Sequence, residues 1–379
     1  MKLSGSSFQT KPRARGFGRF PARWFPTPAM VFPRTAGIDI SDSSVKWIVL
    51  DMFASGYRVD MYGEEPLPPG LVVNGTITDI DSLGRVLGKI KLRLGGIDCA
   101  HVALPEESGY TFEMHVPEGT SRSGILHMIE FEFEGRVPIA PAAAVFDYDT
   151  THREAASGQD IAVVVFPKEL AESYVAAFKV AGITLLSLET EARSIARAIS
   201  SGKPGEPITL LVDFGRARTG FAVLKNGIPI FTSTVEVGGD AVNRALAEKL
   251  SLSPEEIIAF KNEQGLQAQG GVKSVGADIL VGVASVLGDE VARHYHYWDT
   301  RRNEHGDRMT PVERIVLVGG SSNLNGLTDY LAGRVQAQTV VGDVWQHVCD
   351  FDEYIPPISR RDSLQYATAI GLALRSLAI

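Results

Sequence analysis

Two short stretches of this chain combine an aspartate with small hydroxyl and glycine residues, a combination suited to binding phosphate and magnesium. Asp39 and Asp213 each end an apolar run, and a turn of small or polar residues follows each. The donors expected in these turns are Ser43, Ser44, Gly215 and Thr219. Backbone N–H groups and hydroxyls there can donate to phosphate oxygens. Because a carboxylate repels a polyphosphate, Asp39 and Asp213 are candidate Mg²⁺ ligands, acting through bound water.

The two stretches repeat one pattern in register. Residues 37–50, GIDISDSSVKWIVL, align with residues 212–224, VDFGRARTGFAVL, so that Asp39 falls on Asp213. Each copy predicts an apolar strand, a turn and a second apolar strand, which is a β-hairpin. A single copy is more typical of an ordinary hairpin turn. Two copies in register favour a Mg-nucleotide held between two similar half-domains.

Further glycine-containing turns follow two other predicted strands. Gly319 and Gly320 come after the apolar strand at 314–318, where they let a flat ring or a ribose approach the backbone closely. By itself, this pattern is also typical of an ordinary strand-to-helix turn. Gly238 and Gly239 follow a strand at 231–237, and Asp240 is the expected N-cap of the next helix.

A helix is expected at 189–199, where it would cross between the half-domains. Glu189 or Glu191 would then project toward the terminal phosphate, and a carboxylate there can orient an attacking water as a general base. Glu191 is the candidate catalytic residue. The alternative is an exposed glutamate favoured at a helix N-terminus by the helix dipole.

The rest of the chain must position these turns. Its 379 residues, 44% of them hydrophobic, predict two or three domains. The net charge of −8 does not fit a nucleic-acid binder. The two cysteines, Cys99 and Cys349, lack metal-type spacing and fit a reducing compartment. A helix with Asp81 as N-cap is expected before the strand at 100–104.

Between residues 106 and 187 the predicted order is strand, helix, strand, strand, helix, strand, which indicates a separate small subdomain. The acidic residues of its first helix favour a solvated face, since no metal ligand accompanies them. These residues are Glu130, Glu132 and Glu134. Further on, His294 and His296 are two residues apart, which does not suit metal ligands on one helix face, so they are expected at the surface or in packing.

Residues 1–34 differ in kind from the rest, with seven basic residues, no acidic residue and aromatic residues separated by prolines. The prolines interrupt any apolar run long enough for a secretory signal. A disordered extension is one interpretation. The other is a basic, aromatic arm that rests on an anionic membrane surface, which attracts each basic residue by about 1 kcal/mol.

The order of GIDISDSSVK, LVDFGRARTG, VEVGGD and VLVGGSSNLNGL resembles the phosphate-1, phosphate-2 and adenosine motifs of the actin-like ATPase superfamily. LPPGLVVNGTITD, VALPEES, IEFEFEGRVPIAPAAAVFDY, LETEARSIARAI and AIGLALRSL resemble, more specifically, the PilM family of type IV pilus assembly proteins. The resemblance covers residues 35–379. It implies an α/β, ribonuclease H-like fold, with two half-domains around a nucleotide cleft and an inserted subdomain 1C.

The resemblance also implies a division of the chain. The expected parts are a basic, disordered extension at 1–34, subdomain 1A at 35–105, the insert 1C at 106–187, a connector helix and linker at 188–207, subdomains 2A and 2B at 208–354, and a C-terminal helix returning to 1A at 355–379. ATP and Mg²⁺ are the implied cofactors. The implied nucleotide-binding residues are Asp39, Ser43, Ser44, Lys46, Asp213, Gly215, Thr219, Gly238, Gly239, Lys261, Gly319, Gly320, Ser321 and Asn323.

The implied role is a cytoplasmic scaffold, peripheral to the inner membrane. Such a scaffold grips the N-terminal cytoplasmic peptide of a PilN-like membrane protein in a groove between 1A and 1C. That groove would be lined by residues 38–50, 100–104 and 106–187. Contacts with a PilB-like ATPase and a PilC-like platform protein are also implied, and self-association is a further possibility. The same scaffold role occurs in type II secretion-like complexes.

Three positions depart from the family pattern. Ser41 replaces a glycine, Asp42 replaces a small residue, and Ile258 replaces a glutamate three positions before Lys261. A carboxylate at Asp42 is costly beside phosphates unless a cation such as Arg218 or Arg216 offsets it. Weak nucleotide binding with little turnover follows as a prediction.

Two alternative functions fit the same fold. One is an FtsA-like protein that tethers the division machinery to the membrane; the chain ends in SLAI, without the amphipathic tail expected of such an anchor. The other is an actin-fold phosphotransferase, for which a dedicated aspartate base in a substrate cleft would be expected.

Overall fold

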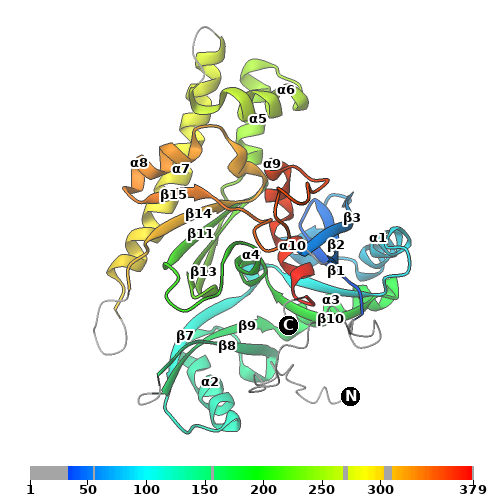
Figure 1. The fold of residues 1–379 in the computed structure, drawn as a ribbon, viewed down its shortest axis with the longest axis vertical. Coiled ribbons are helices and arrows are strands. Elements are labelled where there is room, and N and C mark those ends of the chain that lie inside the picture. The colour runs from blue at the N-terminus through cyan, green and yellow to red at the C-terminus, as the bar shows by residue number, and fades with distance from the viewer. Residues whose placement is uncertain (1–32, 54–55, 155–157, 268–271, 303–309, 378–379) are drawn as a thin grey trace.

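Two five-stranded sheets form the body of the computed structural model, which describes residues 33–53, 56–154, 158–267, 272–302 and 310–377 (Figure 1). The first sheet has the order β10-β6-β1-β2-β3 and the second β13-β12-β11-β14-β15. The strands of the first are β1 (Thr35–Ile40), β2 (Ser44–Phe53), β3 (Gly56–Pro66), β6 (Cys99–Leu104) and β10 (Thr184–Thr190). Those of the second are β11 (Thr209–Phe214), β12 (Thr219–Lys225), β13 (Ile228–Val235), β14 (Arg314–Val318) and β15 (Gln338–Val341).

The two sheets match strand for strand. β1 pairs antiparallel with β2 and parallel with β6, and β11 pairs in the same ways with β12 and β14. Continuous apolar runs such as 210–212 are buried, as suits strands covered on both faces. The predicted fold class, α/β with two similar half-domains, is confirmed.

Helices α4 (Glu191–Ile199) and α10 (Ala367–Leu374) lie between the sheets, and their apolar residues share one core with residues of both. The packing is close enough to require glycine. A Cβ at Gly37 would lie 2.1 Å from the carbonyl oxygen of Ala369, and Gly371 packs as closely on α4. α10 therefore joins β1 to α4.

Other helices cover the outer faces of the sheets. α1 (Ile80–Arg93) and α3 (Lys168–Ala181) share the core of the first sheet. α5 (Gly239–Leu250), α6 (Pro254–Ala259), α7 (Val272–Thr300) and α8 (Leu327–Val335) share the core of the second. The smaller elements used below are β4 (Val72–Val73), β5 (Thr76–Ile77), the 3₁₀ turn η1 (Glu106–Ser108) and α9 (Arg360–Ser363).

A third sheet forms a separate subdomain together with α2 (Arg122–Arg136). Its order is β7-β9-β8, and its strands are β7 (Tyr110–Val116), β8 (Ala144–Glu154) and β9 (Gly158–Pro167). Figure 1 shows it at the opposite end of the molecule from α5 and α6. The sequence predicts α3 and β10 in this subdomain as well. Instead, the apolar face of α3 packs in the core of the first sheet and β10 pairs with β6. The wider limits 106–187 stay a prediction.

Two helix starts differ from the prediction. α1 is capped by Asp79, whose carboxylate accepts a hydrogen bond from the N–H of Ser82 at 3.0 Å, and not by Asp81. α5 begins at Gly239 and not after Asp240, because hydrogen bonds to the preceding hairpin turn hold the backbone there. The N-terminal extension, up to residue 32, lies outside the described residues.

Candidate functional site

The turn between β1 and β2 is held by its own serines. The N–H and the hydroxyl of Ser41 both donate to the carbonyl oxygen of Ser44, at 2.9 and 3.0 Å. Lys46 Nζ donates to the Ser44 hydroxyl at 3.1 Å and lies 3.3 Å from a carboxylate oxygen of Glu64. Ser43 is part of this turn and is half-buried. The ammonium group of Lys46 therefore lies beside the turn that was predicted to bind phosphate.

The matching turn between β11 and β12 is tied to the start of α5. The N–H of Gly215 donates to the carbonyl oxygen of Arg218 at 3.0 Å. A Cβ at Gly238 would lie 2.4 Å from the carbonyl carbon of Ala217, so only glycine fits there. The hydroxyl of the fully buried Thr219 donates inside the fold, to a carbonyl oxygen 2.6 Å away.

The turn after β14 meets the second turn at close range. Gly319 has φ +85°, and a Cβ there would lie 2.4 Å from Asp213 Oδ1. The Ser321 hydroxyl donates to the carbonyl oxygen of Gly215 at 2.9 Å, and a Cβ at Gly239 would lie 2.1 Å from that hydroxyl. Gly320 is exposed next to this contact. These glycines are needed for contact between protein segments around Asp213.

Two predicted nucleotide contacts lie on neighbouring segments. Lys261 Nζ donates to Asn243 Oδ1 at 2.8 Å, and burial lowers the pKa of this lysine. The amide of Asn323 donates to the carbonyl oxygens of Gly320 and Arg361 at 3.2 and 2.9 Å. Ile258, the departure noted in the sequence, is 56% exposed and makes no substitute polar contact.

Carboxylates gather where the first and second turns face each other. Asp39 and Asp213 interact electrostatically, and Lys46 acts on both. Burial and the charge of Asp39 raise the pKa of Asp213 to about 7. Burial also raises the pKa of Asp39, an effect that Lys46 offsets in part. Burial and the charges of Asp39, Glu106 and Asp213 raise the pKa of Glu191 well above its ordinary value.

Glu106 belongs to this group, and sequence analysis missed it. Its side chain is 6% exposed and accepts a hydrogen bond from the N–H of Ala192 at 3.0 Å. Burial raises its pKa to about 7. It directly follows Pro105 at the carboxyl end of β6, the edge of a parallel sheet where ligands bind, and that position was the available signal.

Glu189 has a different environment from Glu191. It ends up in β10 and not in the helix, and its carboxylate bonds to Arg197 at 2.7 Å and also pairs with Arg375. Burial would raise the pKa of Glu189, but the hydrogen bonds and charges of these arginines lower it to about 2. Of the two glutamates considered, only Glu191 interacts with Asp39 and Asp213.

Asp42, the unexpected carboxylate of the first turn, is paired within the protein. It accepts hydrogen bonds from the N–H groups of Asn74 and Gly75 at 3.2 and 3.1 Å, and it forms an ion pair with Arg218. Arg216 pairs instead with Asp240, at 3.1 Å. Arg218 therefore supplies the offsetting charge that the sequence requires.

The arrangement fits Mg²⁺ held through water. Among the described residues, no group of three acidic, histidine or cysteine side chains is arranged to hold a metal ion directly. Mg²⁺ commonly keeps several waters and is held by one or two carboxylates together with substrate phosphates. Asp39 and Asp213 can provide that number of carboxylates, and when bound the ion would neutralise phosphate charge.

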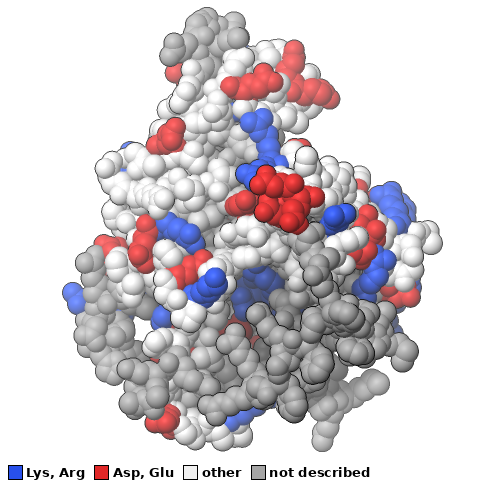
Figure 2. All heavy atoms as spheres, in the orientation of Figure 1, with Lys and Arg blue, Asp and Glu red and all other residues white. Residues whose placement is uncertain are grey.

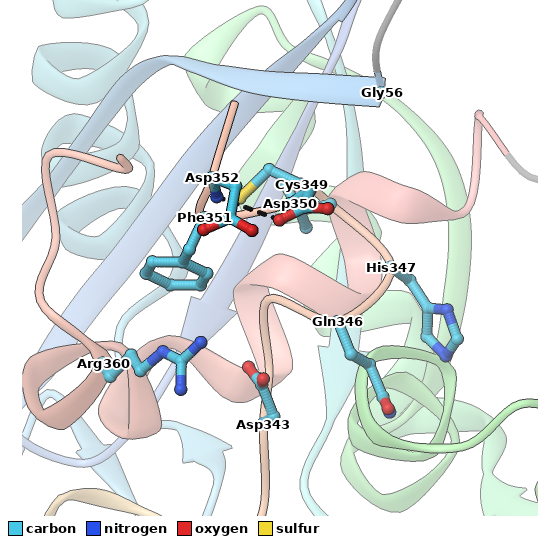
Figure 3. Close-up of a pocket in the computed structure, with 10 residues that line it drawn as sticks. Gly56, Asp343, Gln346, His347, Cys349, Asp350, Phe351, Asp352 and Arg360 are labelled. Carbon is cyan, nitrogen blue, oxygen red and sulfur yellow. Dashed lines mark hydrogen bonds between the residues drawn. The ribbon is translucent and has the colours of Figure 1, made fainter. Parts of the chain in front are cut away.

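A separate pocket of about 600 Å³ contains none of the predicted site residues. Figure 3 shows it between Gly56, at the start of β3, and the loop 343–352, with Arg360 over the ring of Phe351 at 4.0 Å. Asp343, Asp350 and Asp352 make its lining acidic. Figure 2 shows acidic side chains gathered in the middle of this face of the molecule.

Two like sheets, paired aspartate-ended turns and a helix between them define the actin-like ATPase class of fold. The model of the family described as type IV pilus assembly protein PilM matches residues 37–377. The chain therefore belongs to that family.

Three solved structures share the fold at low sequence identity. A PilM-PilN type IV pilus biogenesis complex has a TM-score of 0.74 and 18% identity, covering 91% of this chain and 99% of that one. The ethanolamine utilization protein EutJ from Carboxydothermus hydrogenoformans has a TM-score of 0.52 and 15% sequence identity, and the match covers 90% of this chain and 89% of EutJ. MreB 5 of Spiroplasma citri, solved bound to AMPPNP, has a TM-score of 0.51 and 13% sequence identity, and the match covers 89% of this chain and 94% of MreB 5.

Across the described part of the chain, no helix has both the length and the apolar character needed to cross a bilayer.

Proposed function

We propose that this chain is a nucleotide-binding cytoplasmic scaffold of the inner-membrane complex that assembles type IV pili, or of a related type II secretion-like complex. The observation that carries the proposal is that the charges of Asp39 and Asp213, one from each matching turn, act on each other and that Lys46 acts on both. Membership of the PilM family supports the pilus assignment.

ATP with Mg²⁺ is the proposed ligand of the cleft. The first turn would bind phosphate through Ser43, Ser44 and Lys46, and the second through the backbone around Gly215. The glycines 238, 239, 319 and 320 would let ribose or base approach the backbone, with Lys261, Ser321 and Asn323 around them. The hydrogen bond from the Ser321 hydroxyl to the carbonyl oxygen of Gly215 supports this, because it brings the second and third turns to one place.

Slow or absent hydrolysis is part of the proposal. Glu191 interacts with both aspartates, where it would orient water, but burial and these neighbouring charges raise its pKa and so disfavour the ionised form. A protonated carboxyl cannot accept a proton from water, so it is a poor general base. The scaffold would then hold nucleotide rather than turn it over.

Calorimetry with Mg-ATP tests the nucleotide site. We expect a dissociation constant above about 100 µM for the wild type and a loss of about tenfold, or 1.4 kcal/mol, in Lys46→Met, which removes the cation beside the first turn. Lys89→Met is the control, because Lys89 is exposed on the outer helix α1. Equal affinities in both variants, or micromolar affinity with steady phosphate release, would contradict the proposal.

The proposed partner is the N-terminal cytoplasmic peptide of a PilN-like membrane protein, bound between the first half-domain and the insert. Val175 of α3, an apolar side chain that is 48% exposed, supports it, because α3 directly follows β9 of the insert and packs in the core of the first sheet. A PilB-like ATPase, a PilC-like platform protein and a second copy of this chain are further proposed partners.

Peripheral attachment to the inner membrane is proposed on the basic, aromatic composition of residues 1–34. Co-sedimentation with vesicles containing anionic lipid checks it. The full chain should pellet at low salt, and it should remain in solution at high salt or once residues 1–34 are removed, because screening and loss of the basic residues both weaken attraction to the surface.

A further inference from the structure

Arg218 joins three parts of the molecule. It lies in the second turn, directly before Thr219, and its guanidinium group pairs with Asp42 of the first turn and with Glu107 at the entry to the insert. The side chains of Arg218, Asp42 and Glu107 are 23%, 28% and 18% exposed. Solvent therefore screens these pairs less than it screens ion pairs on the open surface.

The backbone that carries Arg218 is fixed. The carbonyl oxygen of Arg218 accepts the N–H of Gly215, and that of Arg216 accepts the N–H of Asp240 at 2.9 Å. Gly238 packs on Ala217 so closely that no Cβ fits between them. Because the backbone of this turn is fixed, any movement of the Arg218 guanidinium group must come from rotation of its side chain.

The two acidic partners of Arg218 hold the segment through which the chain enters the insert. Asp42 accepts the N–H of Gly75, and a Cβ at Gly75 would lie 2.2 Å from Pro105, next to η1. The hydroxyl of the buried Tyr174 of α3 donates to the carbonyl oxygen of Gly75 at 2.9 Å. Glu107 is in η1, which leads directly into β7. The Arg218 pairs thus brace the entry segment of the insert.

We propose that Arg218 senses the terminal phosphates of the nucleotide. Phosphate offers a guanidinium group several charged oxygens in bidentate geometry, so it competes with a single carboxylate for this side chain. When the polyphosphate lies between the turns, Arg218 leaves Glu107 for it, and the entry segment of the insert loosens. This inference rests on the proposed nucleotide site and adds a path from that site to the subdomain that borders the partner groove.

Amide hydrogen exchange of residues 106–116, measured by mass spectrometry, tests whether Arg218 leaves Glu107 when nucleotide binds. In the wild type, saturating Mg-ATP should raise the exchange rate of these amides about fivefold or more. In Glu107→Gln, the rate should already be raised without nucleotide and change little on its addition, and the affinity for Mg-ATP should rise. Arg218→Met should bind Mg-ATP about tenfold more weakly, a loss of 1.4 kcal/mol.

Arg216→Met is the matched control. Arg216 lies in the same turn but is 70% exposed and pairs with Asp240, so this variant should behave as the wild type does. Nucleotide binding without a rise in exchange at 106–116, or the same rise in Arg218→Met, would overturn the inference and leave the proposed function standing. Absence of nucleotide binding in the wild type would overturn the proposed function, and this inference with it.

Discussion

Two hydrogen bonds join the segments of Glu106 and Glu191, and in each a backbone N–H of one segment donates to the glutamate carboxylate of the other. The N–H of Glu106 donates to Glu191 Oε2 at 3.3 Å, and the N–H of Ala192 donates to Glu106 Oε2 at 3.0 Å. This exchange fixes the end of β6 against the start of α4. It also places two carboxyl groups in the region where Asp39 and Asp213 interact.

The first prediction concerns the pH range between about 4.5 and 7. The pKa of Glu106 is raised by burial to about 7, so the folded state binds a proton that the unfolded chain releases above about pH 4.5. Its contribution to the free energy of unfolding therefore falls between pH 4.5 and 7, by about 3 kcal/mol. Glu106→Gln should remove this loss, so that urea unfolding at pH 5 and pH 8 differs less than in the wild type. Glu130→Gln, on an exposed part of α2, is the control.

The second prediction concerns acid. Arg197 and Arg375 bind the Glu189 carboxylate and lower its pKa to about 2. Glu189 therefore stabilises the folded state fully above its pKa in the unfolded chain, about 4.5, and this stabilisation is lost as the pH falls toward 2. Glu189→Ala should cost about 3–5 kcal/mol at neutral pH, since two arginines lose their partner in a buried site.

Asp289→Ala provides a comparison for that variant. Asp289 pairs with Arg334, and both side chains are about half exposed, at 58% and 47%. Removing an exposed ion pair should cost less than about 1 kcal/mol. If urea unfolding showed a similar decrease in the free energy of unfolding for both variants, the stabilising role of the buried Glu189 ion pairs would be contradicted.

The third prediction concerns Gly319. An alanine there would adopt a left-handed backbone, with its Cβ 2.4 Å from Asp213 Oδ1. We expect Gly319→Ala to destabilise the protein by about 2–3 kcal/mol and to weaken Mg-ATP binding, because Asp213 must move. Gly333→Ala on α8 has open space around the new Cβ and should raise stability by about 0.5–1 kcal/mol. Thermal unfolding and calorimetry measure both effects.

The fourth prediction concerns the partner groove. Val175 of α3 is 48% exposed, and Val175→Asp should weaken binding of a PilN-type N-terminal peptide at least tenfold by placing a charge in an apolar contact. Val286→Asp on α7 is a fair control, since Val286 is 50% exposed but belongs to the other half-domain. Fluorescence anisotropy of a labelled peptide distinguishes the two. Equal affinities would place the peptide elsewhere.

Local sequence patterns predicted the fold better than the contacts of the site. The two strand–turn–strand copies depend on neighbours in sequence, so they could be predicted. Glu106 and Glu191 are 85 residues apart, and Arg218 and Asp42 are 176 apart. Glu106 and Glu191 meet only once β10 pairs with β6, and Arg218 and Asp42 meet only once both half-domains are folded, so composition and spacing could not reveal these contacts. The ligand assignments of the turn residues remain predictions.

The position of α10 sets the order in which the molecule can be completed. This helix is synthesised after everything it contacts, yet it packs directly on β1, the first strand of the body. While the ribosome still holds residues 367–374, the apolar side chains of β2 and α4 that share a core with α10 stay open to water. The central layer therefore closes only after translation has passed that helix.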